Sequence, residues 1–320
     1  MKPKVIVEID KTNMPEDVTE ALKPYAEVVY TRSPFGDHLN EAVGMLVGGS
    51  KIDAEFLDNA PKLKVIARFG VGYDSVDVEE CTRRGVYATH TPGVLSGGVA
   101  DHTWALILGL MRRIPEADRY VRTGWAKKER RVPFGWDMEG KVLGFLGLGR
   151  IGAEVLKRSQ GFDTVNQYYD IVRNEALEEK YGVRYVGFEE LLKTSDILTV
   201  HVPLLPSTRH IIGEKEFEMM KESAVIVNTS RGSVIDEKAL MEVLMKGKIR
   251  GAALDVFEQE PTPLENPLLQ LANVVVSPHC ASATWETRRK MAKCNVENVI
   301  ACLKRGRPPD VVPEQRGFTF

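Results

Sequence analysis

Arg231, Glu260 and His279 are side chains whose types suit proton transfer on an anionic molecule. The planar guanidinium of an arginine can bind a carboxylate through two parallel hydrogen bonds, which the ammonium of a lysine cannot do. A histidine that is held by a carboxylate can donate and accept a proton near neutral pH. Each also has an ordinary alternative, because Arg231 could form a surface ion pair and His279 could be satisfied within a turn.

The surrounding sequence places all three side chains after predicted strands. They follow short apolar segments of the kind found in parallel strands that are buried on both faces. These segments are, in chain order, 224–228, 252–256 and 274–277. In an open parallel sheet, the carboxyl ends of the strands border the crevice in which ligands bind. The shared edge favours a common catalytic role over three unrelated surface roles.

A glycine-rich motif, GLGRIG, occupies residues 147–152, after the predicted strand 142–146 and before a helical pattern. Gly147 permits a tight turn, Gly149 lets the backbone approach a pyrophosphate, and Gly152 lets the helix pack close to the strand. The N-terminus of that helix offers unpaired N–H groups and a partial positive charge to phosphates. This strand–turn–helix context predicts a dinucleotide site rather than an ordinary glycine turn.

Two charged residues bear on which dinucleotide would bind. Arg150, within the motif, could contact a phosphate directly. Asp170 lies 18 residues after Gly152, at the end of the next predicted strand, 164–169. An acidic residue there accepts hydrogen bonds from the adenosine ribose and repels a 2′-phosphate, which favours NAD over NADP. Arg173, three residues further on, could weaken this selection by attracting the phosphate.

Strand-like segments alternate with helical patterns along nearly all 320 residues, which predicts an α/β fold with two doubly wound parallel-sheet domains. The first series of predicted strands is 5–8, 26–30, 45–47, 64–67 and 86–88. The second series is 142–146, 164–169, 197–201, 224–228, 252–256 and 274–277. An apolar helix at 99–113 separates the series, and a long helix at 283–304 follows the second. We therefore expect a discontinuous domain, 1–98 and 287–320, with a second domain, 99–286, inserted into it.

The overall composition argues against several classes of protein. Lys and Arg number 43 and Asp and Glu 45, so the net charge of −2 gives no global attraction to nucleic acid or to an anionic membrane. No apolar run approaches the roughly 18 residues of a membrane span, and the N-terminus lacks a signal-peptide pattern. The four cysteines form no CxxC pair, so we expect reduced thiols in a cytoplasmic protein. No Cys, His and acidic residues have metal-ligand spacing, so we expect no metal.

The chain resembles the D-isomer-specific 2-hydroxyacid dehydrogenase family, with its glyoxylate/hydroxypyruvate reductase and phosphoglycerate dehydrogenase branches, over nearly its whole length. The segments that carry the resemblance are RFGVGYDSVD (68–77), GLGRIG (147–152), HVPLLPSTRHII (201–212), NTSRGSVIDEKAL (228–240), GAALDVFEQEP (251–261) and SPHCASAT (277–284). The resemblance implies a Rossmann-type NAD-binding domain, 99–286, inserted into a flavodoxin-like substrate-binding domain, 1–98 and 287–320. Members of the family are usually homodimers built around the inserted domain.

The resemblance also implies roles for individual residues. Arg231 would anchor the substrate, Glu260 would be the partner of the histidine, and His279 would be the proton donor. The backbone N–H groups of Val71 and Gly72 would hold the substrate carboxylate. The implied cofactor contacts are Gly147, Gly149, Arg150, Ile151, Gly152, Asp170, Val202, Thr229, Ser230, Asp255 and Ser282. Cys280 departs from the aliphatic residue common after the histidine; it could be a small apolar residue or an oxidisable thiol.

The expected reaction is the NADH-dependent reduction of a small 2-oxo acid to the D-2-hydroxy acid, and its reverse. Glyoxylate, hydroxypyruvate, 3-phosphohydroxypyruvate and longer 2-oxo acids all fit the motifs, so the substrate stays open. One branch of the family consists of nucleotide-sensing co-repressors; only residues 310–320 follow Pro309, too few for an added interaction domain, which disfavours that alternative. Formate dehydrogenases of the wider family carry Gln at the position of Glu260, which disfavours that assignment.

Overall fold

The structure is a computed structural model that describes residues 2–127 and 132–320. The chain divides into two compact units, of which the first comprises Met1–Leu95 and Ser282–Phe320 and the second Ser96–Ala281. The predicted boundaries, after residues 98 and 286, lie three and five residues beyond these divisions. No helix among the described residues is long and apolar enough to cross a membrane.

The first unit contains a parallel sheet of five strands in the order β2-β1-β3-β4-β5. The strands are β1 (Lys4–Val7), β2 (Glu27–Tyr30), β3 (Ala42–Val47), β4 (Val65–Arg68) and β5 (Tyr87–Thr89). This order is flavodoxin-like, as expected, with the switch between β1 and β3. The α-helices of this unit are α1 (Glu16–Thr19), α2 (His38–Glu41), α3 (Ala54–Asp58), α4 (Val78–Arg83) and α12 (Trp285–Arg305).

The second unit contains a parallel sheet of seven strands in the order β12-β11-β10-β9-β6-β7-β8. The strands are β6 (Val142–Leu146), β7 (Val165–Tyr169), β8 (Arg184–Tyr185), β9 (Ile197–Val200), β10 (Val225–Asn228), β11 (Gly251–Leu254) and β12 (Val274–Val276). This is the Rossmann order with a seventh strand at one edge, and its switch point lies between β6 and β9. Strand β8 was not predicted, because an edge strand of two residues carries no readable sequence pattern.

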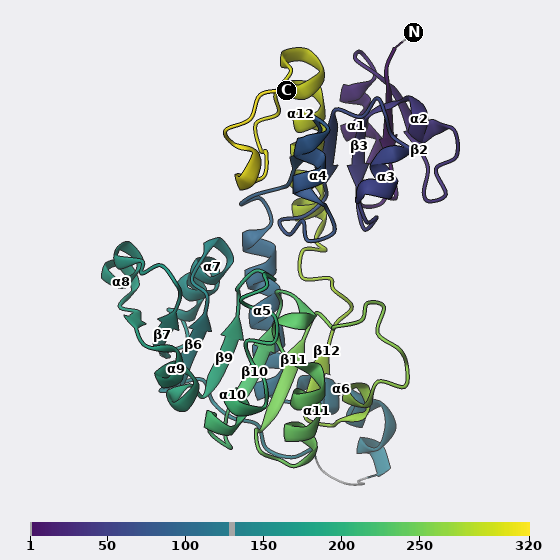
Figure 1. The fold of residues 1–320 in the computed structure, drawn as a ribbon. Helices are drawn as coiled ribbons and strands as arrows, with labels where there is room; N and C mark the ends of the chain where they lie inside the picture. The colour runs from purple at the N-terminus through teal and green to yellow at the C-terminus, as the bar shows by residue number, and fades with distance from the viewer. Residues whose placement is uncertain (1, 128–131) are drawn as a thin grey trace. The chain divides into compact units, whose positions relative to one another are not determined.

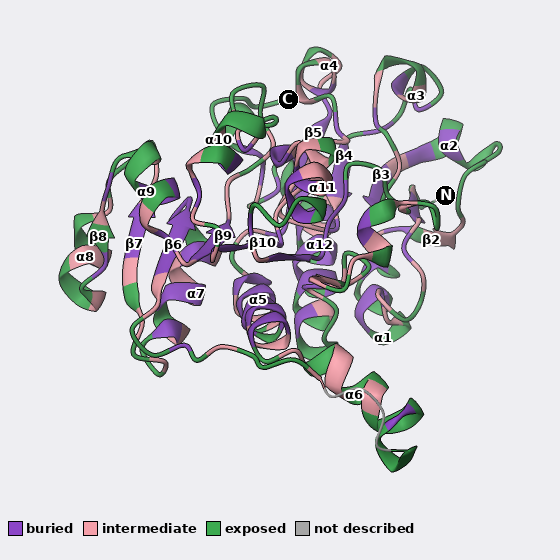
Figure 2. Ribbon diagram, turned by 90° about the horizontal axis from the view of Figure 1, so that it is seen from below, coloured by how far each residue is buried: buried purple, intermediate pink, exposed green. Residues whose placement is uncertain are grey.

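Helices cover both faces of the seven-stranded sheet (Figure 1). The α-helices of this unit are α5 (Ser96–Met111), α6 (Ile114–Thr123), α7 (Arg150–Ser159), α8 (Glu175–Tyr181), α9 (Phe188–Thr194), α10 (Glu214–Met219) and α11 (Glu237–Met245). Val225 and Val227 of β10 pack in the core with α5 and α7, whereas Ile226 packs in the core with α9, α10 and α11. The central strands are therefore buried on both faces, as their apolar runs predict (Figure 2).

Short 3₁₀ helices and polar caps complete the elements. The 3₁₀ helices are η1 (Glu20–Leu22), η2 (Trp125–Lys127), η3 (Gly232–Val234), η4 (Pro267–Gln270) and η5 (Pro313–Gln315). Asp236 caps α11 by accepting a hydrogen bond from the N–H of Ala239, and Thr284 caps α12 in the same way. Helix α7 differs from these two, because its N-cap is Gly149, which has no side chain to satisfy the first N–H groups.

Candidate active site

The glycine motif forms a loop between β6 and α7 at the switch point of the seven-stranded sheet. Gly147 has a φ of +90°, and a Cβ there would lie 2.9 Å from the Val202 side chain. A Cβ on Gly152 would lie 2.6 Å from the carbonyl oxygen of Gly147, so any side chain would push the helix off the loop. A Cβ on Gly149 would meet nothing within 4 Å, which leaves the backbone open to a ligand. The loop therefore fits a dinucleotide pyrophosphate.

Asp170 follows β7 and lies against this loop. One carboxylate oxygen accepts a hydrogen bond from the N–H of Leu148 at 2.8 Å, and the other accepts one from the N–H of Val172 at 3.3 Å. Each oxygen keeps a lone pair, so the carboxylate can still accept a ribose hydroxyl. Arg150 begins α7 and is exposed, whereas Ile151 packs partly into the core beneath the helix.

Thr229 and Ser230 follow β10, but their hydroxyl groups are engaged within the protein. Thr103 of α5 donates its hydroxyl proton to the carbonyl of Val99, so Thr229 is the donor in the 3.0 Å bond between the two threonines. The Ser230 hydroxyl donates to the side-chain oxygen of Asn228 at 2.8 Å. These hydroxyl protons hold the end of β10 in place and are not available to a ligand.

Gly232 brings the segment with Arg231 against the loop that carries Glu260. A Cβ on Gly232 would lie 1.9 Å from the carbonyl carbon of Phe257, so only glycine allows this approach of the two backbones. The amide of Asn228 donates to the carbonyl of Arg231 at 2.8 Å and fixes the turn after β10. The Arg231 guanidinium donates to the carbonyl of Ser230 at 2.8 Å and is half-buried.

His279 and Glu260 form a direct pair, with 2.6 Å between the imidazole Nδ1 and a carboxylate oxygen. The other carboxylate oxygen accepts the N–H of Phe257 at 3.0 Å. Burial alone would raise the pKa of Glu260, but these two hydrogen bonds and the charges of His279 and Arg231 outweigh it and lower the pKa. Glu260 is therefore an ionised acceptor of the hydrogen bond from Nδ1–H, and it leaves Nε2 of His279 for a reacting molecule.

Asp255 is fully buried just after β11 and holds the loop on which His279 lies. Its carboxylate accepts the Ser277 hydroxyl at 2.6 Å and the N–H groups of Cys280 and Ala281, each at 2.9 Å. Its carbonyl oxygen accepts the N–H of His279 at 2.7 Å. Burial opposes ionisation, yet His102 and the bonds to the carboxylate from Ser277, Cys280 and Ala281 lower the pKa of Asp255. The Asp255 side chain therefore anchors the loop on which His279 lies; its predicted contact with the cofactor stays a prediction.

The backbone of His279 explains why such an anchor is needed. Its φ of +51° lies in the left-handed region, which costs a non-glycine residue about 1 kcal/mol or more unless the surroundings enforce it. His102 of α5 adds a further bond, at 2.9 Å to the Ser277 hydroxyl. Because Ser277 gives its own proton to Asp255, the Nε2 of His102 must be the donor. His102 was not among the predicted site residues, because no sequence spacing links it to Ser277.

His102, Asp255 and Cys280 offer ligand atoms that lie within 4.8 Å of one another, a grouping that could hold a metal ion. Two features make them a hydrogen-bonded cluster instead. Both oxygens of Asp255 already accept protein donors. Burial and the negative charge of Asp255 raise the pKa of the Cys280 thiol, which opposes the thiolate that metal binding and oxidation both need.

Val71 and Gly72 belong to the first unit and follow β4. His90, which is buried, contacts the carbonyl of Val71 through Nδ1 at 3.0 Å and supports this segment. Among the described residues, neither the N–H of Val71 nor that of Gly72 donates a hydrogen bond, so both are available to an anionic ligand. Ser282 also belongs to the first unit; its carbonyl accepts the N–H of Thr284 at 3.0 Å.

Two other features do not suit the expected chemistry. Burial lowers the pKa of His201, after β9, to about 3, so its imidazole stays neutral and cannot donate a proton at neutral pH.

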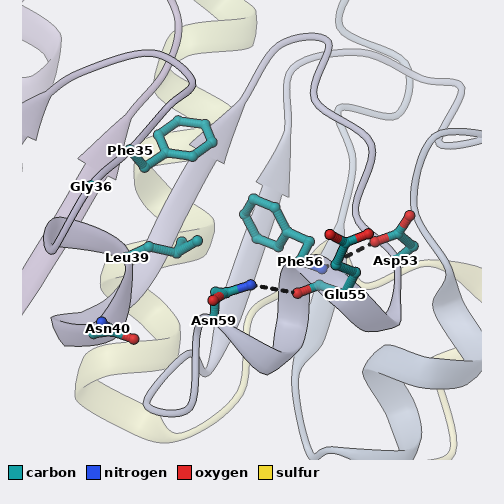
Figure 3. A pocket seen from close by; sticks show the side chains of 8 residues that line it. All are labelled: Phe35, Gly36, Leu39, Asn40, Asp53, Glu55, Phe56 and Asn59. Carbon is teal, nitrogen blue, oxygen red and sulfur yellow. Dashed lines mark hydrogen bonds between the residues drawn. The ribbon is translucent and has the colours of Figure 1, made fainter.

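Figure 3 shows a pocket in the first unit whose lining includes Phe35 and Phe56. The charged residues of that lining are Asp53 and Glu55, so the pocket repels an anionic substrate.

Comparison with known proteins identifies the family. Residues 104–281 match the family profile of the D-isomer specific 2-hydroxyacid dehydrogenase, NAD binding domain. The chain is 44% identical to a glyoxylate reductase of Thermococcus litoralis over 325 aligned residues, which cover 98% of this chain and 97% of that protein. The chain therefore belongs to the D-isomer specific 2-hydroxyacid dehydrogenase family.

Two solved structures share the whole fold. The NADPH-dependent glyoxylate/hydroxypyruvate reductase of Sinorhizobium meliloti, in complex with NADP and malonate, has a TM-score of 0.90 and 32% identity, covering 100% of this chain and 99% of that one. The D-lactate dehydrogenase of Aquifex aeolicus, complexed with NAD and lactic acid, has a TM-score of 0.84 and 30% identity, covering 95% and 98%. These relatives support 2-hydroxyacid dehydrogenase activity.

Proposed function

We propose that this protein is an NAD-dependent D-2-hydroxyacid dehydrogenase that reduces a small 2-oxo acid, with His279 as the proton donor. The observation that carries the proposal is the 2.6 Å pair of His279 and ionised Glu260, beside Arg231, at the carboxyl edge of the sheet that bears the glycine loop. The second unit would bind the cofactor and the first unit the substrate. The relatives named glyoxylate reductase support a short 2-oxo acid such as glyoxylate or hydroxypyruvate.

The chain's own residues would hold the substrate and move one proton. Arg231 would bind the substrate carboxylate, with the N–H groups of Val71 and Gly72 as further donors. Bound NADH supplies the hydride for the carbonyl carbon. His279 would donate its Nε2 proton to the carbonyl oxygen as negative charge develops there, and Glu260 would stabilise the imidazolium before the transfer. In the reverse direction, neutral His279 would accept the hydroxyl proton of the 2-hydroxy acid.

The glycine loop and Asp170 support NAD as the cofactor. The loop leaves room for the pyrophosphate, and the Asp170 carboxylate can accept the ribose 2′-hydroxyl but would repel a 2′-phosphate. The solved relatives include complexes with either NAD or NADP, so this choice needs its own test. We expect the wild type to have the higher kcat/KM with NADH, and Asp170→Ala to lose much of that preference.

We also propose a homodimer in a reducing, cytoplasmic setting. Helix α6 buries none of its residues, and apolar side chains stay exposed in and after it, including Trp125 at 62% and Phe134 at 96%. A second copy of the chain packed on this surface would cover them. All four cysteines are free thiols, as a reducing compartment favours. Sedimentation of the wild type and of Trp125→Glu would test the dimer, because a buried charge should dissociate it.

A substrate screen tests the proposed reaction. Purified protein and NADH are mixed with glyoxylate, hydroxypyruvate, 3-phosphohydroxypyruvate or pyruvate, and NADH absorbance is followed. We expect turnover with at least one of these acids and its loss in His279→Ala, with NADH binding retained. An enzyme that binds NADH but reduces none of the acids, or a His279→Ala variant with wild-type turnover, would contradict the proposal.

A further inference from the structure

We propose that Glu178 is a determinant of cofactor choice, because it holds Arg173 in an ion pair and so withholds a cation that could bind the 2′-phosphate of NADPH. The inference rests on the proposed dinucleotide site. Arg173 is the one cationic residue in the sequence between Asp170 and Glu178, so its state decides whether this segment can accept a phosphate.

The ion pair has the geometry of a fork. The Nε of Arg173 donates to one carboxylate oxygen of Glu178 at 2.9 Å, and Nη2 donates to the other at 2.7 Å. Such paired bonds use the edge of the guanidinium that a phosphate would otherwise bind. The Glu178 side chain is 17% exposed, whereas that of Arg173 is 56% exposed, so the carboxylate is the fixed partner.

A buried tyrosine fixes the carboxylate in turn. The hydroxyl of Tyr168 donates to Glu178 at 2.6 Å and accepts the N–H of Asn174 at 2.7 Å. The bonds from Arg173 and Tyr168 lower the pKa of Glu178 to about 2, so the carboxylate stays ionised throughout the working range of pH. Exposed ion pairs usually contribute little, but this one is bidentate and rests on a fully buried ring.

The held guanidinium lies beside the segment that bears Asp170. It is 5.8 Å from the ring centroid of Tyr185, and the Tyr185 hydroxyl donates to the carbonyl of Asp170 at 3.3 Å. Two features of the segment from Asp170 to Glu178 therefore oppose the binding of a 2′-phosphate. Asp170 presents a negative charge, and Glu178 neutralises the nearby positive one.

Binding measurements separate the role in selection from a role in stability alone. Dissociation constants are measured by calorimetry for NADH, NADPH, 5′-AMP and 2′,5′-ADP, because the last two isolate the effect of the 2′-phosphate. The variants are Glu178→Gln, its exposed neighbour Glu179→Gln as the matched control, Arg173→Ala, and Arg173→Ala combined with Glu178→Gln. Each is also made in an Asp170→Ser background, in which the repulsive carboxylate is gone.

In the Asp170→Ser background, we expect Glu178→Gln to lower the dissociation constants of NADPH and 2′,5′-ADP by about tenfold. This is about the contribution of one charge-assisted hydrogen bond. The affinities for NADH and 5′-AMP should stay within about twofold. Adding Arg173→Ala should abolish the gain, and Glu179→Gln should produce none. Tyr168→Phe, which removes one bond to Glu178, should give a smaller gain in the same direction and serves if Glu178→Gln lowers the melting temperature severely.

Two results would overturn the inference. If Arg173→Ala alone weakens NADPH binding, then Arg173 already reaches the phosphate despite Glu178. If Glu178→Gln changes the affinities for NADH and NADPH equally, then Glu178 has a structural role only. Failure of the proposed function itself would look different, because the wild type would then bind neither NADH nor 5′-AMP.

Discussion

Replacing Gly232 by alanine should separate Arg231 from the His279–Glu260 pair. The added Cβ would lie 1.9 Å from the carbonyl carbon of Phe257 and 2.0 Å from its oxygen. These are backbone atoms and cannot rotate away. Ordinary contact begins near 3.4 Å, so the two segments must move apart by about 1.5 Å. A misplacement of about 1 Å in an active site can lower the rate about a hundredfold.

We therefore expect kcat/KM for the best 2-oxo acid to fall about a hundredfold or more in Gly232→Ala. The glycine loop at 147–152 lies elsewhere in the unit, so the affinity for NADH should change far less. Overpacking should also lower the free energy of unfolding by about 1–3 kcal/mol. The assays are initial-rate kinetics, NADH titration and thermal unfolding.

Gly109→Ala, in the last turn of α5, is the matched control, because a Cβ there would meet nothing within 4 Å. It should keep wild-type kinetics and unfold at the same or a slightly higher temperature, since alanine favours a helix. Wild-type kcat/KM and stability in Gly232→Ala would refute the argument, because they would show that the two loops do not need this close approach.

Further predictions concern single interactions. Arg231→Lys should lower kcat/KM about tenfold to a hundredfold by loss of the guanidinium fork, measured by initial rates; unchanged kinetics would contradict a substrate-anchoring role. His102→Ala should lower kcat about tenfold with unchanged NADH affinity, because Ser277, which is bonded to Asp255, loses its donor, and His102→Gln should restore part of kcat; equal kcat in all three proteins would remove His102 from the site. The folded pKa of Glu178 lies near 2, below its ordinary 4.5, so its ion pair stabilises the fold above about pH 4.5 and is lost as the pH falls toward 2. Melting temperatures of wild type and Glu178→Gln should therefore converge as the pH falls over that range; a constant difference would contradict the pairing.

The sequence predicted the parts of the site that depend on local patterns. The three glycines at 147–152 have separate steric reasons within one turn, so the motif alone predicts their conformation. Arg231, Glu260 and His279 were brought together by topology, because each follows a parallel strand and such strands end at one edge. The direct His279–Glu260 bond then follows from the closeness of β11 and β12 in the sheet.

The parts that were missed depend on where side chains point in three dimensions. That the Asp255 carboxylate also holds the loop of His279 was not predicted, because the sequence shows only that Asp255 follows a strand. His102 lies 175 residues before Ser277 in the chain, and no spacing rule links the two. The ion pair of Arg173 with Glu178 was not predicted either, because it depends on the turn into α8 and on the buried hydroxyl of Tyr168.

The most direct test of the account is a pair of pH–rate profiles, one for reduction and one for oxidation, in the wild type and in Glu260→Gln. Because Glu260 stays ionised through the neutral range, a change in rate there reports the proton on His279. Reduction needs that proton and should fall as the pH rises, whereas oxidation needs the neutral imidazole and should rise over the same range. Glu260→Gln removes the charge that favours imidazolium. The fall in the reduction rate and the rise in the oxidation rate should therefore both occur at lower pH in this variant. If the two rate changes occur at the same pH as in the wild type, or at higher pH, the assignment of Glu260 and His279 as one acid–base unit is contradicted.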